Sequence, residues 1–381
     1  MNITTSSPTA ARIRPLLWAG TALAVVVLSA SLVWLVAPEL SPYAADPNPA
    51  PIHHLFGDAG GARIAAVLLQ AAVSAAASAI GLIALFSGRR PTAPMGVIAV
   101  TSGALGAIGL IGLNGLAISG YTLAHGLPFG ILALLVIAAR TRVARVLVAL
   151  VAVAAAVLLL VGPTPMTAQY RQFGGAVLAD PVRYATPLAM LLLSGVWILI
   201  GVLLVRRAPG PFARFVLRRR IPITIVAACC ALPYVVARLS WLTPWRLAGD
   251  PADYADDTLA FTTGMILGAA MLTGGILTLG LILPWGERLP RWFGRVGGRP
   301  VPVPFAVIPA SIVAILFTTA GLDSLLLART QELALAVPLT AVLFPFWLWG
   351  PMLALAAWGY ALHRGAAEER ETRSHEEAAA R

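Results

Sequence analysis

Charged residues are scarce in this sequence: they occupy only 11% of its 381 positions, and none of them is lysine. A soluble domain carries about 25% charged residues. Hydrophobic residues make up 59% of the chain, far more than the core of one soluble domain would need. These proportions exclude an ordinary soluble fold and predict an integral membrane protein that has the bilayer as its solvent.

Cysteines and catalytic motifs are also nearly absent. The only cysteines, Cys229 and Cys230, are adjacent, and neighbouring side chains of a helix diverge by about 100°, which disfavours a disulfide between them. The sequence contains no Walker loop, no G-x-S-x-G elbow, no HExxH motif and no dinucleotide fingerprint. We therefore expect no metal site and no cofactor, and the sequence favours a non-enzymatic protein over an enzyme.

The net charge of +11 could indicate nucleic-acid binding, but the positions of the charges argue against it. The arginines lie in short stretches beside apolar runs, a pattern typical of membrane topology. We expect no nucleic-acid partner. The expected partner is a lipid bilayer with anionic headgroups at the cytoplasmic face.

Apolar runs recur along the whole chain, each close to the length of about 20 residues that crosses a bilayer as a helix. The predicted fold is all-α: a polytopic transmembrane helix bundle of about ten spans with both termini cytoplasmic. We expect a cytoplasmic segment at 1–14, a transmembrane domain at 15–364 and a charged cytoplasmic tail at 365–381. The predicted spans are 15–37, 62–86, 96–118, 121–139, 143–162, 184–206, 219–241, 259–284, 303–321 and 337–362.

The arginine distribution sets the expected orientation. The stretch from Arg206 to Arg220 contains six arginines in fifteen residues and is predicted to be the main cytoplasmic loop. With both termini inside, 21 arginines lie in the cytoplasm and six outside, as the positive-inside rule requires. Five spans precede the 163–183 loop and five follow it, which fits either an inverted repeat or a division by chance.

Two apolar stretches carry candidate binding residues. Glycines at every third position from Gly103 to Gly115 form a helix surface that suits tight helix packing or a substrate path, and Asn114 lies near the outer end of this stretch. Residues 344–351, FPFWLWGP, predict a kink or break, because Pro345 leaves the Ala341 carbonyl without its helical donor. Pro233 is a second predicted kink. The predicted substrate-binding residues are Trp347, Trp349, Pro345 and Asn114.

The outer segments contain most of the remaining polar residues. One polar cluster predicted at the outer face comprises Arg238, Arg246, Asp250, Asp253, Asp256 and Asp257, and it fits either a solvated loop or a divalent-cation site. His53 and His54, with Asp46 and Asp58 nearby, are predicted to be an exposed pair rather than a metal or general-base site. Residues 322–336 predict an amphipathic helix at the outer interface. No Asp, Glu or Arg falls near the middle of a predicted span, which argues against proton-driven or cation-driven transport.

Two C-terminal stretches resemble a known group of proteins. Residues 283–304, LPWGERLPRWFGRVGGRPVPVP, and 344–364, FPFWLWGPMLALAAWGYALHR, are similar to stretches of actinobacterial multi-pass integral membrane proteins that have no assigned activity. In that group a W-G-x-x-L-P-R-W loop follows one span, and a W-G-rich final span ends in a basic tail. The resemblance covers only the C-terminal part of the chain. It implies a plasma-membrane protein of this lineage and transfers no catalytic residue.

Several functions remain open on these features. The leading hypothesis is a bacterial plasma-membrane protein that acts as a permease-like carrier or as a membrane partner subunit, alone, as a homo-oligomer or with another membrane protein. The first alternative is a membrane-embedded enzyme that acts on a lipid or lipid-linked substrate at the outer face through the aspartate and arginine cluster. The second is a structural or regulatory membrane subunit.

Overall fold

The computed structural model of the chain describes residues 8–44, 50–56, 58–87, 92–138, 142–161, 165–205, 210–245, 247, 258–291, 297–330 and 341–379. Helices dominate these residues, and within them the only extended pairing is an isolated bridge between Arg288 and Pro300. The predicted all-α class is confirmed. The backbone of a helix satisfies its own hydrogen bonds, which is what a chain with so few polar side chains needs inside lipid.

The described elements, in chain order, are α1 (Pro8–Val36), η1 (Pro38–Leu40), η2 (Pro51–Leu55), α2 (Ala59–Phe86), α3 (Ala93–Leu110), α4 (Gly112–Ala138), α5 (Arg142–Val161), α6 (Pro165–Ala179), α7 (Pro181–Val205), α8 (Pro211–Arg218), α9 (Arg220–Cys229), α10 (Leu232–Leu239), η3 (Ser240–Leu242), α11 (Thr258–Leu279), α12 (Pro284–Glu287), α13 (Val303–Thr330) and α15 (Phe346–Ala379). The elements labelled η are short 3₁₀ turns.

The protein is a multi-pass membrane protein. In the described part of the chain, 8 helical segments are long and apolar enough to cross a membrane: Arg14–Val36, Ala59–Phe86, Ala93–Leu110, Pro181–Leu204, Arg220–Leu242, Phe261–Leu279, Val303–Leu327 and Ala341–Ala367. The expected spans 121–139 and 143–162 correspond to α4 and α5, except for residues 139 and 162, which lie outside the described residues. The total of ten spans stays a prediction.

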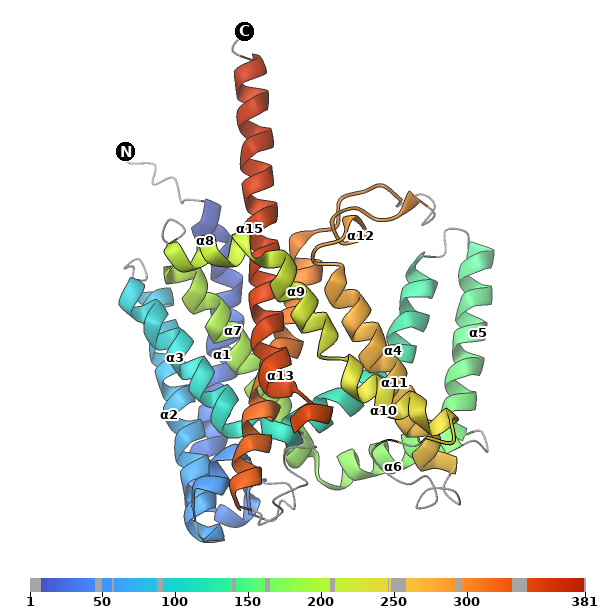
Figure 1. Cartoon of the computed structure of the whole chain (residues 1–381). Helices are drawn as coiled ribbons and strands as arrows, with labels where there is room; N and C mark the ends of the chain where they lie inside the picture. Colours follow the sequence, from blue (N-terminus) through green and yellow to red (C-terminus); the bar gives the residue numbers. More distant parts are fainter. Residues whose placement is uncertain are drawn as a thin grey trace.

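Figure 1 shows long helices that run between two ends of the bundle. α1 begins and α15 finishes at the same end, which we call the terminal end, and α8 and α12 also lie there. α6 and η3 lie at the opposite end. This arrangement places the arginine-rich α8 and the α12 loop on the same side of the molecule as both described chain ends.

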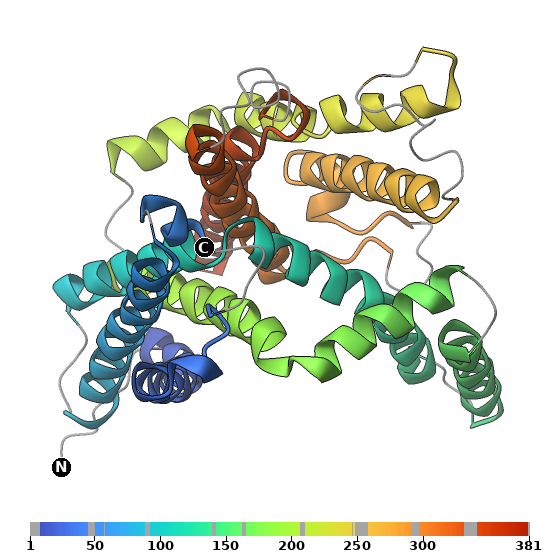
Figure 2. The same cartoon turned by 90° about the horizontal axis from the view of Figure 1, so that it is seen from below.

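The bundle contains two cores. The first core is formed by α1, α2, α3 and α7 and includes the fully buried Trp197 and Met190. The second is formed by α8, α9, α13 and α15 and includes Trp349 and Tyr360. Seen from below, α4 and α5 lie to one side of the helices that form the first core, and α13 and α15 lie near the centre (Figure 2).

Glycines allow the helices of the first core to approach closely. A Cβ at Gly103 would lie 2.8 Å from the Ser194 carbonyl oxygen, and one at Gly106 would lie 3.1 Å from the Met190 methyl carbon. A Cβ at Gly201 would lie 2.5 Å from the Gly96 carbonyl oxygen on the other side of the α3–α7 contact. The predicted packing role of the glycine-rich stretch is confirmed at Gly103 and Gly106, because an added Cβ would meet backbone at Gly103 and would require the Met190 methyl to shift at Gly106.

Two predicted boundaries are wrong. The helix break expected between residues 118 and 121 lies instead at Ile111–Gly112, where Gly112 has a φ of 52°. A separate amphipathic helix is expected at 322–336. In the structure, residues 322–330 instead continue α13, which begins at Val303 and ends at Thr330. The sequence LDSLLLA at 322–328 is apolar apart from two residues, so the helix continues once Asp323 has polar partners inside the protein.

The two predicted proline discontinuities are confirmed. α9 ends at Cys229 and α10 begins at Leu232, directly before Pro233. The last span is interrupted at Phe344 and Pro345, and α15 begins at Phe346. Proline lacks the amide donor that would continue each helix from the preceding turn.

Candidate functional site

The break between α3 and α4 is stabilised by an acidic side chain from a distant part of the sequence. Asp323 of α13 accepts a hydrogen bond through Oδ2 from the backbone N–H of Leu113, at 2.8 Å. The positive φ of Gly112 belongs to the left-handed region that favours glycine. A Cβ on Gly112 would also collide with the Asp323 carboxylate and the Pro51 ring. The carboxylate therefore caps the N-terminus of α4, where the helix dipole favours negative charge.

The other carboxylate oxygen of Asp323 meets a histidine of the segment between α1 and α2. The Nε2 atom of His54, in η2, lies 3.1 Å from Asp323 Oδ1. The Asp323 side chain is 3% exposed and the His54 side chain is 11% exposed. Within the described residues, the contact with His54 is the one polar interaction of Oδ1.

The segment that carries His54 is also anchored on its other side. The Tyr43 hydroxyl donates to Gln70 Oε1 at 2.7 Å, and Gln70 Nε2 donates to the Ser31 hydroxyl at 3.1 Å. Gln70 is 1% exposed, deep between α1 and α2. Residues 38–44 and 50–56 thus fold into the opposite end of the bundle, with Tyr43 and His54 as their polar anchors. We call these two stretches the outer cap.

The second discontinuity lies at the start of α15. Pro345 leaves the Ala341 carbonyl without a helical donor, and the indole Nε1 of Trp347 supplies one at 3.2 Å. Trp347 is 45% exposed and Trp349 is 3% exposed, so the two side chains point to opposite sides of the helix, as expected for a separation of about 200°. The donor comes from the same segment, six residues further along the chain, and not from a neighbouring helix.

A cavity of about 660 Å³ adjoins this break. Its lining is apolar and includes Pro345 and Trp347, but Trp349 faces the second core instead. Residues of α9 and the following turn form the other wall, among them Ile225, Val226 and Cys229. The predicted substrate-binding roles of Trp347, Trp349 and Pro345 stay predictions, and the cavity's chemistry suits an apolar group.

α13 connects the two discontinuities. A Cβ at Gly321 would collide with the backbone of Trp347, and one at Gly350 would collide with the backbone of Thr318. α13 and α15 are therefore in backbone contact just past the break at Pro345. Asp323, two residues after Gly321, lies about 200° further round α13 and reaches the α3–α4 break. A displacement of α13 would therefore change the contacts at both the α3–α4 break and the break at Pro345.

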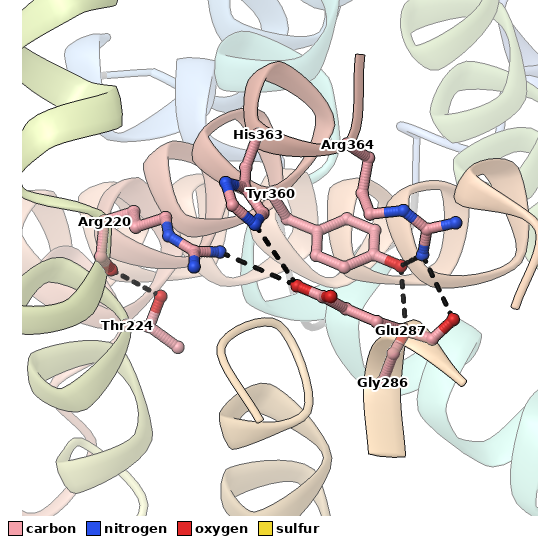
Figure 3. Close-up of polar contacts among 7 residues, drawn as sticks. All are labelled: Arg220, Thr224, Gly286, Glu287, Tyr360, His363 and Arg364. Atoms are coloured by element: carbon pink, nitrogen blue, oxygen red, sulfur yellow. Dashed lines mark hydrogen bonds and ion pairs between the residues drawn. The ribbon is translucent and has the colours of Figure 1, made fainter. Parts of the chain in front are cut away.

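A second polar cluster lies at the terminal end, where α12 meets α9 and α15 (Figure 3). Glu287 Oε1 lies 3.4 Å from His363 Nε2 and 4.0 Å from Arg220 Nη1. These partners differ from Arg288 and Arg291, the neighbours in the sequence that an isolated loop would offer. The Glu287 side chain is 35% exposed, so water screens both contacts.

Arg364 secures the same loop through its backbone. Its Nη1 donates to the Glu287 carbonyl at 3.3 Å and to the Tyr360 hydroxyl at 2.9 Å, and its Nη2 donates to the Val301 carbonyl at 3.2 Å. The Tyr360 hydroxyl in turn donates to the Gly286 carbonyl at 2.8 Å, as Figure 3 shows. We call this cluster the inner clasp, and its saturated contacts indicate a structural role.

The remaining predicted site residues are only partly described. Asn114 lies in the first turn of α4, next to Leu113 and the Asp323 contact, so the structure brings it to the α3–α4 break. Arg238 lies 4.1 Å from the Trp241 ring centroid and 4.7 Å from that of Tyr234, and its aliphatic part packs on Gly268. The other members of the outer polar cluster, Arg246, Asp250, Asp253, Asp256 and Asp257, lie outside the described residues, as does Asp46.

The neighbouring histidine and aspartate have local roles. Nδ1 of His53 lies 3.1 Å from the Ala50 carbonyl, and the Asp58 carboxylate caps α2 by accepting from Gly61. His54 is not the exposed residue that the sequence predicts, because it is buried against Asp323. Within the described part of the chain, no group of three His, Cys, Asp or Glu side chains is arranged to hold a metal ion.

Sequence reasoning missed Asp323 as a site residue. The predicted span ended at residue 321, which placed Asp323 in an exposed outer segment, although it belongs to the apolar stretch Val303–Leu327. The available signal was a lone acid within an otherwise apolar run. Its partners, His54 and Leu113, are 269 and 210 residues away, so only the tertiary structure identifies them.

No protein family, curated protein or solved structure matches this chain in the comparisons with known proteins.

Proposed function

We propose that this protein is a permease-like carrier of a bacterial plasma membrane, with ten spans and both termini in the cytoplasm. The observation that carries the proposal is the contact between Asp323 and His54 beside the α3–α4 break: Asp323 is buried near the end of the candidate span Val303–Leu327, and His54 reaches it from η2, outside the spans. Ionisable groups inside a membrane bundle are costly and are typical of ion and substrate pathways. Carriers often place such groups where a spanning helix is interrupted.

The meeting of two interrupted helices on α13 supports the same function. Irregular backbone at membrane depth is tolerated where protein or a water-filled cavity covers it. Here the breaks at Gly112 and Pro345 both lie against α13. We propose that substrate binds between them, near Asn114 and Trp347, with an apolar portion of the substrate in the cavity beside Pro345. Trp349 would support this site from the core.

The terminal end supports a cytoplasmic orientation and contact with anionic lipid. α8 buries Ala213 and Val216 against the bundle and exposes Phe212 and Phe215. Arg214, Arg218 and Arg219 are exposed around the same helix. We propose that α8 lies in the cytoplasmic interface, with the phenyl rings toward the acyl chains and the arginines at anionic headgroups. The resemblance to actinobacterial membrane proteins supports the lineage part of this proposal.

A membrane partner subunit is the second candidate function. α15 continues to Ala379 and projects beyond the rest of the bundle at the terminal end (Figure 1). A helix that is polar all round and leaves the bundle is typical of a connection to another domain or protein. Copurification of a second membrane protein with the full-length chain, lost on removal of residues 368–381, would favour this candidate.

The carrier is tested by counterflow in proteoliposomes. Amino acids, sugars, nucleosides, carboxylates and amines are first screened for a rise in the melting temperature of the purified protein. We expect at least one stabilising compound to exchange across the liposome membrane. If no stabilising compound exchanges, the carrier proposal is wrong, and chemical conversion of a compound would point to the enzyme alternative instead.

A further inference from the structure

We propose that Asp323 and His54 together form a proton-binding site that fastens the outer cap over the α3–α4 break, and that uptake of a second proton releases the cap. The inference deepens the proposed carrier by naming the proton as its coupling ion, and that part rests on the proposed function. The opening of the cap is independent of it and can be measured without a substrate.

The two oxygens of the Asp323 carboxylate are held in different ways. Oδ2 accepts the hydrogen bond of the Leu113 amide, whereas Oδ1 faces His54 Nε2 at 3.1 Å. A backbone amide cannot change its charge, whereas an imidazole can gain or lose a proton. Oδ1 is therefore the atom that is available to take a proton.

Within the described residues, the ionisable groups around Asp323 come from one element. His54 and His53, both in η2, are the side chains whose charge reaches Asp323. α3 contains no ionisable side chain, and the first turn of α4 contributes only peptide groups and the neutral Asn114. The net charge at this site is therefore set by the two histidines and the carboxylate.

Proton uptake changes the charge of the site in a defined way. In the proposed closed state the His54–Asp323 pair holds one proton and has no net charge. A second proton from the outer solution binds Oδ1, which leaves a neutral acid and an imidazolium with no counter-charge. A buried imidazolium without a partner is driven toward water. Because His54 lies in η2, its withdrawal lifts the outer cap. A neutral Asp323 also accepts a weaker hydrogen bond from the Leu113 amide, which loosens the start of α4.

The structure provides a path for the proton and a mechanical link. His54 is the more exposed member, at 11%, and it belongs to the cap itself. η2 packs against α2, α3 and α13, so its release would uncover the α3–α4 break from one side. Tyr43 would keep the other part of the cap attached to Gln70, which makes this a hinged opening rather than unfolding.

The test measures access to the underside of the cap. In a variant without Cys229 and Cys230, Ile52→Cys places one thiol on a half-buried position of η2 that packs on the first core. Labelling by a membrane-impermeant methanethiosulfonate is compared at about pH 8 and about pH 5, the range over which histidine sites change charge. Each rate is divided by that of Gln172→Cys, an exposed position at the same end, to remove the intrinsic effect of pH on thiols.

We expect the normalised rate to rise about tenfold on acidification, as an open state that is a minor population becomes the major one. Asp323→Asn, which mimics the neutral acid, should give the high rate at both pH values. Asp58→Asn removes an exposed carboxylate near the cap and should keep the full pH response. An unchanged rate in the parent variant, or a pH response that survives Asp323→Asn, overturns the proposal.

His54→Gln is a second test of the proposal, for the case in which the Asp323→Asn variant does not fold. Glutamine can still donate to Oδ1 but holds no proton charge, so the pH response should be lost. A response equal to that of the parent would overturn the proposal. A protein that opens with acid but exchanges no compound in the counterflow assay contradicts the carrier function alone and leaves the proton site intact.

Discussion

At the scale of single residues, Gly112 joins local conformation to the candidate site. Its positive φ ends α3, and the absence of a Cβ gives room to the Asp323 carboxylate and the Pro51 ring. Five glycines lie between Gly103 and Gly115 at equal spacing, yet only Gly112 among the residues of this stretch has a positive φ. The difference arises because Asp323 meets the chain at this position and caps the following amide.

Gly112→Ala should destabilise the protein. The left-handed backbone alone costs about 1–2 kcal/mol for a residue with a Cβ, and overpacking against Asp323 and Pro51 adds about 1–3 kcal/mol. We expect a lower melting temperature in detergent. Gly120→Ala is the control, because it lies in the same helix with nothing within 4 Å of the added Cβ. Equal melting temperatures for the two variants would contradict the role assigned to Gly112.

At the scale of elements, the inner clasp holds the loop around α12 against α15. Arg364 reaches the Glu287 and Val301 carbonyls, one on each side of the loop, and Tyr360 binds the Gly286 carbonyl. These are contacts to backbone, so they fix the path of the loop whatever its side chains do. The clasp and the outer cap lie at opposite ends of the bundle, and α13 begins just after the clasp and reaches the cap.

Arg364→Leu should loosen the α12 loop without unfolding the bundle. The variant keeps an aliphatic side chain but removes three donated hydrogen bonds, and net losses of about 1–3 kcal/mol are typical when charged donors are involved. Hydrogen exchange should increase in residues 284–291 and 297–301, while α2 and α7 remain protected. Arg218→Leu, at an exposed position of α8, should leave the loop unchanged. Unchanged exchange in the Arg364 variant would show that the clasp is dispensable.

At the scale of the whole molecule, the arrangement of the helices agrees with the distribution of arginine. The described ends of the chain, α8 and α12 lie together at the terminal end, and α6 and the outer cap lie at the other (Figure 1). The positive-inside rule then predicts that the terminal end lies in the cytoplasm. The proposal that the second proton reaches Asp323 from outside depends on this orientation.

Cysteine labelling tests the orientation. In a variant without Cys229 and Cys230, Gln172→Cys should react with an impermeant reagent added to intact cells. Ser87→Cys and Gly210→Cys, both exposed at the terminal end, should react only after permeabilisation. Labelling of either terminal-end position from outside would invert the topology and place the Asp323 site near the cytoplasm.

The amino-acid sequence is sufficient to predict that the molecule is an all-α membrane protein. The scarcity of charge and the recurring apolar runs require helices that satisfy their own backbone in lipid. The prolines at 233 and 345 fixed two of the discontinuities, because proline has no amide to donate. The sequence also indicates that the Ala341 carbonyl lacks its helical donor. The folded structure is needed to identify the Trp347 indole as the donor that replaces it.

Which residues form the candidate site depends on contacts that are visible in the tertiary structure. Hydropathy is read over a window of neighbours, and in that window Asp323 resembles the start of an exposed loop. Its burial depends on His54 and on the Leu113 amide, which the fold brings from other helices. The same holds for Glu287, whose partners Arg220 and His363 come from α9 and α15 rather than from its own loop. Charge pairing across helices has no local pattern, because what makes a buried charge tolerable is the approach of a partner in space.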